Sequence, residues 1–244
     1  MIGSVTRITF GGWGRGRALA PARWLVLSLS LALALCALPV LAPATSARAA
    51  NDGGNSSIPH ILVLGDSLVA GYGLGPGEAF PEMLGAALHA KGRPVRVTNA
   101  GVSGDTSAGG LARVEWSLDD KPDLLILELG ANDALRGLPV DDLRRNLAAI
   151  IEASRKRGVR VLLAGMHAPR NLGPDYIRRF DAVYPELAKH YGLTLYPFFL
   201  DGVALDRSLN LPDGMHPNPK GVQVIVERML PVVERELDVL RTGN

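Results

Sequence analysis

The feature of this 244-residue sequence that most constrains its fold is the alternation of short, mainly apolar runs with longer amphipathic ones. The short runs are rich in Val, Ile and Leu, as is typical of strands buried on both faces of a parallel sheet. They cover residues 61–64, 95–99, 124–129, 159–164 and 193–196. We therefore predict five parallel strands, each buried on both faces and joined to the next by a helix.

The longer runs repeat apolar residues at helical spacing. In the run over 140–157 this stripe consists of Val140, Leu143, Leu147, Ile150 and Ile151. Further helices are predicted over residues 78–90, 106–118, 174–190 and 218–240. We place Pro217 at the first position of the last helix, and Pro231 inside it predicts a kink or a break into two helices. This strand–helix order indicates an α/β fold, a three-layer α/β/α sandwich around a parallel sheet.

The N-terminal segment has the three parts of a secretory signal. Residues 1–49 contain five arginines and no acidic residue, and an apolar stretch over 24–41 precedes Ala47-Arg48-Ala49-Ala50, an A-x-A site. An uncleaved anchor is the alternative, because the stretch approaches the ~20 residues that span a bilayer. Two prolines interrupt it, however, so we expect cleavage after Ala49 or Ala50. We predict a signal peptide over 1–49, a flexible leader over 50–57 and one folded domain over 58–244.

Composition and charge argue against a nucleic-acid partner and indicate the route of export. Without the five N-terminal arginines, 21 basic residues stand against 24 acidic ones, and no segment interleaves aromatic with basic residues. A nucleic-acid partner is therefore not expected. No Arg-Arg pair marks a twin-arginine signal, so the Sec route to the periplasm or the medium is expected, without a stable membrane anchor after cleavage. The sole cysteine, Cys36, leaves with the signal.

Polar clusters follow the first three predicted strands, at the sheet edge where α/β proteins bind ligands. They read Gly65-Asp66-Ser67, Gly104-Asp105-Thr106 and Gly130-Ala131-Asn132. Ser67 is a candidate nucleophile, although Asp66 or Ser67 could instead simply cap a helix. Gly104 lets a backbone N–H approach a ligand, and the Asn132 amide can hold an oxyanion. An ordinary glycine turn and an Asx turn are the corresponding alternatives.

The segment Asp213-Gly214-Met215-His216-Pro217 supplies a candidate base. A serine hydroxyl is a weak nucleophile that needs such a base. His216 can take the proton, and Asp213, three residues earlier, can hold the imidazole's tautomer across a turn that Gly214 permits. His167, which follows the fourth predicted strand, is the second candidate.

Together these blocks resemble the GDSL/SGNH hydrolase family, and within it the bacterial thioesterase I/protease I/lysophospholipase L1 group, also called arylesterases. The four family positions match Ser67, Gly104, Asn132 and His216, and the resemblance covers residues 61–233. It implies a flavodoxin-like sheet of strand order 2-1-3-4-5, with no metal and no organic cofactor.

The resemblance also implies residue roles. Ser67 attacks the acyl carbonyl, His216 acts as base and then as acid, and Asp213 orients His216. The oxyanion hole consists of the backbone N–H groups of Ser67 and Gly104 with the Asn132 side chain.

In the family, the loop after the asparagine block shapes the acyl pocket. Here that loop covers residues 134–140, so Leu135, Leu138 and Val140 are expected to form an apolar wall. Where relatives have small or hydrophobic residues, this chain has His167 and Arg170, and their effect on substrate preference is left open.

We therefore predict a monomeric serine esterase that acts on small carboxylic esters or thioesters, such as aryl esters, acyl thioesters or lysophospholipids. An alternative with the same triad is a deacetylase of an exported or cell-wall polysaccharide. A non-catalytic binding module, and a metallohydrolase that uses Asp213, His216 and Asp201 or Asp206, are further alternatives. The spacing of those last residues matches no familiar ligand pattern.

Overall fold

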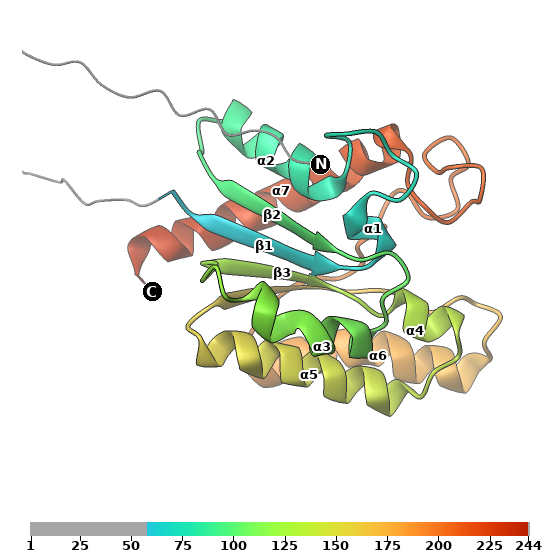
Figure 1. Cartoon of the computed structure of the whole chain (residues 1–244). Helices are drawn as coiled ribbons and strands as arrows, with labels where there is room; N and C mark the ends of the chain where they lie inside the picture. Colours follow the sequence, from blue (N-terminus) through green and yellow to red (C-terminus); the bar gives the residue numbers. More distant parts are fainter. Residues whose placement is uncertain (1–57, 244) are drawn as a thin grey trace, which may run out of the picture. The chain divides into compact units, whose positions relative to one another are not determined.

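The computed structural model describes residues 58–243, which contain a five-stranded, wholly parallel sheet (Figure 1). Its strands are β1 (His60–Gly65), β2 (Arg96–Gly101), β3 (Leu124–Glu128), β4 (Arg160–Ala164) and β5 (Thr194–Tyr196). They lie in the order β2-β1-β3-β4-β5. The predicted α/β class and strand order are confirmed.

Helices cover both faces of the sheet. The long ones are α2 (Phe80–Ala90), α3 (Ser107–Ser117), α5 (Val140–Lys156), α6 (Pro174–Tyr191) and α7 (Pro219–Thr242). Figure 1 shows α2 and α7 on one face and α3, α5 and α6 on the other. Two one-turn helices, α1 (Ser67–Ala70) and α4 (Ala131–Leu135), follow β1 and β3. They were not predicted, because one turn is too short to show a helical period.

The strands are not all buried as predicted. Every residue of β1 and β3 is buried, whereas β2 is an edge strand whose residues are only half-buried and whose Arg96 is exposed. The prediction of five strands buried on both faces is therefore wrong for β2, and also for β5 at the other edge, where Thr194 and Leu195 are half-buried. The polar side chains of Thr98 and Asn99 agree with the edge position of β2.

The final helix differs from the prediction at two prolines. Helix α7 continues unbroken through Pro231, because its buried stripe of Val226, Met229 and Val233 extends across the proline. Its first residue is Pro219 rather than Pro217, and the Asn218 side chain caps it by accepting the N–H groups of Lys220 and Gly221.

The signal peptide and leader predicted over residues 1–57 lie outside the described residues. Within residues 58–243, none of the helices is both long enough and apolar enough to cross a membrane.

Candidate active site

Ser67 is the first residue of α1, directly beyond the carboxyl end of β1. Asp66 caps this helix, and its side chain accepts the Leu68 N–H at 3.0 Å. The Ser67 hydroxyl therefore has no capping role, and its Oγ lies 2.9 Å from Nε2 of His216. Gly65 precedes the turn because a side chain there would collide with Glu128, whose Oε2 would lie 2.6 Å from a Cβ.

His216 is held by a tight local turn. Its Nδ1 lies 2.6 Å from Oδ2 of Asp213, whose Oδ1 accepts the backbone N–H groups of Met215 and His216 at 2.9 and 3.0 Å. The turn passes through Gly214 at φ +71°. Those backbone hydrogen bonds are the main reason why the pKa of Asp213 is lowered to about 2. An ionised Asp213 favours the tautomer with a proton on Nδ1, which leaves Nε2 free to accept the Ser67 proton.

The two other predicted site residues lie at the same edge of the sheet as Ser67, and Asn132 lines the same cavity. Gly104 adopts φ +86°, which favours glycine, and its carbonyl accepts Nη2 of Arg136 at 2.7 Å. Nδ2 of Asn132 donates to Oδ2 of Asp66 at 3.1 Å and to the Asp105 carbonyl at 3.0 Å. Among the described residues, the backbone N–H groups of Ser67 and Gly104 donate to no other protein group. Two such backbone donors thus lie at this sheet edge, together with an Asn132 amide whose hydrogens bind Asp66 and the Asp105 carbonyl.

A buried carboxyl pair underlies this edge. Asp66 and Glu128 are both 0% exposed, and Oε2 of Glu128 accepts the Asp66 N–H at 3.4 Å. Burial raises the pKa of Asp66 to about 6 and the pKa of Glu128 well above its ordinary value. Burial of the pair therefore favours the protonated form of Glu128. The sequence offered one signal for it, a lone carboxylate inside an apolar run.

Arg113 on α3 ties together the segments that carry Ser67 and Gly104. Its Nη2 donates to the Gly65 carbonyl at 2.9 Å, its Nη1 to the Ala100 carbonyl at 2.7 Å, and its Nε to Asp105 at 2.7 Å. The ends of β1 and β2 are thereby fixed relative to the start of α3. The sequence reasoning gave Arg113 no role, because its partners are mainly backbone carbonyls.

Two further contacts position Asn132. The buried carboxylate of Asp133 accepts the Ser107 N–H at 2.7 Å and the Ser107 hydroxyl at 2.6 Å. On the other side, the Tyr184 hydroxyl donates to the Leu129 carbonyl at 3.0 Å and leaves no room for a side chain at Gly130. The Asn132 backbone is thus fixed from both sides.

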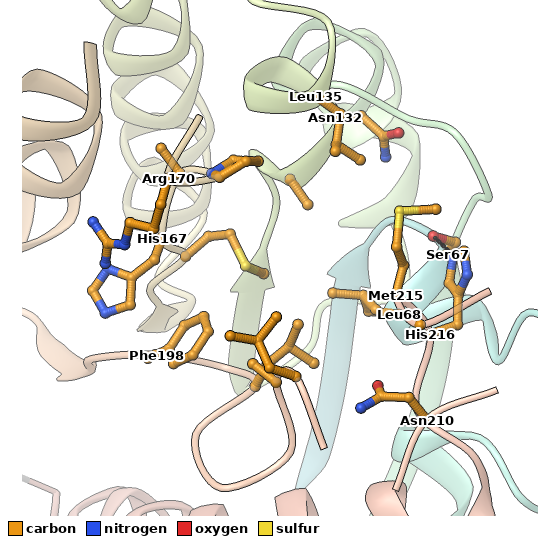
Figure 2. A pocket seen from close by; sticks show the side chains of 18 residues that line it. Ser67, Leu68, Asn132, Leu135, His167, Arg170, Phe198, Asn210, Met215 and His216 are labelled. Atoms are coloured by element: carbon orange, nitrogen blue, oxygen red, sulfur yellow. Dashed lines mark hydrogen bonds between the residues drawn. The ribbon is translucent and has the colours of Figure 1, made fainter. Parts of the chain in front are cut away.

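A cavity of about 560 Å³ opens beside Ser67, and most of its lining is apolar (Figure 2). Of the three residues expected to form the apolar wall, Leu135 lines this cavity, whereas Leu138 and Val140 do not. Val140 is buried in the core at the start of α5, and the Leu138 carbonyl binds the Tyr176 hydroxyl at 2.9 Å. The apolar wall comes instead mainly from loops whose residues carry no periodic signal. They are Met166, Phe198, Leu200, Leu205 and Met215.

His167 and Arg170 lie at the end of this cavity opposite Ser67 (Figure 2). Asp181 on α6 binds Arg170 Nη1 at 3.0 Å and lies 3.4 Å from His167 Nδ1. The His167 ring packs against Phe198, with ring centroids 4.5 Å apart. His216, rather than His167, is therefore the imidazole that contacts Ser67.

The carboxylates considered for a metal site have other partners. Asp201 pairs with Arg228, and Asp206 accepts the N–H and hydroxyl of Ser208. Residues 58–243 contain no group of three His, Cys, Asp or Glu side chains placed to hold a metal ion.

The chain matches the family model of the GDSL-like lipase/acylhydrolase family over residues 63–224. It is 41% identical to esterase TesA of Pseudomonas aeruginosa, over 71% of this chain and 87% of that protein. It is 37% identical to thioesterase 1/protease 1/lysophospholipase L1 of Escherichia coli, over 69% of this chain and 80% of that one. The crystal structure of AlinE4, an SGNH-hydrolase family esterase, aligns with a TM-score of 0.63 and 47% identity, over 74% of this chain and 97% of that chain. The protein is a serine ester hydrolase and belongs to the GDSL-like lipase/acylhydrolase family.

Proposed function

We propose that the protein hydrolyses carboxylic esters or thioesters through an acyl-enzyme on Ser67. The observation that carries this proposal is the continuous hydrogen-bonded chain from Ser67 Oγ through His216 to Asp213, which opens into a mainly apolar cavity. A hydroxyl in contact with a neutral imidazole, itself oriented by a carboxylate, is the arrangement that activates a serine.

In this mechanism Ser67 Oγ attacks the acyl carbonyl while its proton passes to His216 Nε2. Asp213 stabilises the imidazolium, and the oxyanion accepts the N–H groups of Ser67 and Gly104 and one N–H of Asn132. That Asn132 hydrogen is shared with, or withdrawn from, Asp66 or the Asp105 carbonyl. His216 then protonates the leaving alcohol or thiol, and a water activated by the same imidazole releases the acid.

The cavity supports a small substrate with an acyl or aryl group, since apolar groups line most of it. Aryl esters, acyl thioesters and lysophospholipids fit this description. A polysaccharide acetyl ester, the alternative substrate, would use little of this apolar surface. Its sugar hydroxyl groups would find few hydrogen-bond partners in the cavity. The enzyme would act as a monomer and needs no cofactor for these steps.

Replacement of Ser67 tests the proposal. Ser67→Ala should retain less than about 1% of wild-type kcat/KM toward p-nitrophenyl acyl esters, since loss of a catalytic serine costs up to about 10⁶ in rate. A fluorophosphonate should label the wild type at Ser67 and leave the variant unlabelled. Ser208→Ala, which alters an exposed serine bonded to Asp206, is the matched control and should hydrolyse at the wild-type rate. Hydrolysis by Ser67→Ala above that level would contradict the assignment.

The composition of residues 1–49 supports export by the Sec route, followed by action in the periplasm or the medium. Expression of the full chain in a Gram-negative host should yield a mature enzyme in the periplasm or the medium that begins at Ala50 or Asn51. Intact mass and N-terminal sequencing would measure this, and a product that keeps Met1 in the membrane fraction would argue for an uncleaved anchor.

A further inference from the structure

The cavity has two chemically different ends. Ser67, Asn132 and His216 lie at one end, and His167 and Arg170 lie at the other, with mainly apolar side chains between them (Figure 2). The mechanism above uses only the first end. A cavity that served only an uncharged hydrocarbon would gain nothing from a guanidinium and an imidazole in its lining, because an apolar group offers neither side chain a hydrogen bond.

The polar end is held in place by one carboxylate. Oδ1 of Asp181 accepts the Ala168 N–H at 2.9 Å, while Oδ2 binds Arg170 Nη1 at 3.0 Å and lies 3.4 Å from His167 Nδ1. The Asp181 side chain is 23% exposed, so these contacts are partly shielded from water. Both carboxylate oxygens are thus already used within the protein.

Arg170 gives this end of the cavity a surplus of hydrogen-bond donors. Arg170 is always charged and carries five N–H groups, of which Asp181 binds only the Nη1 end. Its side chain is 65% exposed, and it lines the cavity. The His167 ring is fixed between Asp181 and Phe198. The group best suited to such donors is a carboxylate, which a guanidinium can bind through two parallel hydrogen bonds.

We propose that Arg170 and His167 form a binding subsite for a carboxylate that the ester substrate carries at the end remote from its scissile carbonyl. An apolar spacer between the two groups would occupy the middle of the cavity. This inference rests on the proposed function, and it makes the enzyme selective for amphiphilic esters with a charged terminus.

The test compares two chromogenic ester series of matched length. One series has acyl chains that end in a methyl group, and the other has chains that end in a carboxylate, both with p-nitrophenol as leaving group. At the spacer length that reaches Arg170, wild-type kcat/KM should favour the carboxylate ester by about tenfold or more, as expected for hydrogen bonds to charged groups. The preference should appear in KM, because the subsite does not contact the reacting atoms.

Arg170→Gln should abolish this preference, so that kcat/KM for the carboxylate-terminated and methyl-terminated esters becomes equal within about twofold. His167→Gln should reduce the preference by a smaller factor. The matched control is Arg178→Gln, which removes another exposed arginine that pairs with an aspartate, in this case Asp175. Arg178→Gln should keep the full preference, so a general effect of surface charge would be recognised.

A second series places the carboxylate on the alcohol instead of on the acyl chain. A preference that depends on Arg170 in either series supports the subsite and assigns it to the acyl or to the leaving-group side. Equal rates for charged and uncharged esters at every length in both series, or a preference that survives in Arg170→Gln, would overturn it. Failure of the proposed function is a separate result, namely methyl-terminated esters that are not hydrolysed or are hydrolysed without Ser67.

Discussion

Two His–Asp pairs line or border the same cavity, and they have different partners. His216 lies 2.6 Å from Asp213 and contacts the Ser67 hydroxyl, whereas His167 lies 3.4 Å from Asp181, which also binds Arg170. The two residues of the first pair are three positions apart, and the backbone N–H groups of Met215 and His216 donate to the Asp213 carboxylate and close the turn between them. The second pair joins the loop after β4 to α6, fourteen positions further along the chain.

This difference shows that a general base is defined by its contacts rather than by its residue type. Within residues 58–243 Asp213 pairs with no Lys or Arg, so its charge is available to stabilise an imidazolium next to Ser67. Asp181 already neutralises Arg170, and the imidazole of His167 packs against Phe198. In our proposals the same two residue types therefore support proton transfer at one end of the cavity and substrate binding at the other.

The largest expected effect separates the two histidines. His216→Gln should lower kcat/KM toward a short, uncharged aryl ester by about 10⁴-fold or more, since it removes the base. His167→Gln should leave that rate within about twofold. Steady-state kinetics on both variants measures this, and a comparable loss in His167→Gln would remove the distinction.

The two aspartates should differ by a similar but smaller factor. Asp213→Asn should lower kcat by about 10³- to 10⁴-fold, because the amide favours the wrong imidazole tautomer. Asp181→Asn should leave kcat toward the same ester unchanged, since Asp181 contacts no reacting group. Equal losses in the two variants would show that the second pair takes part in the chemistry.

The pH dependence of kcat should contain a contribution from a third carboxylate, Asp66, which belongs to neither His–Asp pair. With its pKa lowered to about 2, Asp213 stays ionised above pH 4, whereas the pKa of Asp66, which binds the Asn132 amide, is about 6. Protonation of His216 removes the base, and protonation of Asp66 weakens its hold on that amide, so kcat should fall in acid and the part due to Asp66 should have a midpoint of about 6. Asp181→Asn should leave the midpoint unmoved.

Asp66→Asn provides the matching variant, because its side-chain oxygen can still accept the Leu68 N–H while the charge is lost. It should be slower at pH 8 by less than the ~100-fold that follows complete loss of an oxyanion donor. Wild-type activity in this variant at pH 8 would exclude Asp66 as the positioning group.

The smallest expected effect is on stability, and here Asp181 should matter more than Asp213. Asp181→Asn should lower the free energy of unfolding by about 1 kcal/mol, because Asp181 joins Ala168 and Arg170 to α6 through partly buried hydrogen bonds. Asp213 lies in an exposed turn, so its replacement should lower stability less. Chemical denaturation of both variants measures this, and a greater loss in Asp213→Asn would contradict it.

Much of this architecture follows from short-range sequence patterns. The buried strands are apolar runs, and the carboxyl ends of parallel strands meet at one edge, which is why Ser67, Gly104 and Asn132 could be grouped in advance. The turn from Asp213 to His216 is local and closed by Gly214. Such features depend on neighbouring residues, so a single sequence displays them.

The features that could not be predicted depend on contacts between distant segments. The edge position of β2 is decided by the order of strands in the sheet, and the apolar cavity wall is assembled from separate loops after β4 and β5. Arg113 acts mainly on backbone carbonyls, which have no side-chain signature. Pro231 is tolerated because the packing of α7 outweighs the loss of one backbone hydrogen bond.

The buried pair of Asp66 and Glu128 also makes folding a proton-binding reaction. Burial raises the pKa of Asp66 from 3.8 to about 6 and that of Glu128 well above 4.5, so above pH 4 the native chain retains protons that the unfolded chain releases. The contribution of this pair to the free energy of unfolding therefore decreases as the pH rises through that range. Unfolding at pH 5, between the two pKa values of Asp66, should release protons to the buffer, and its calorimetric enthalpy should depend on the buffer's own heat of ionisation. This pair thus stabilises the enzyme most in mild acid, where protonated Asp66 makes it least active.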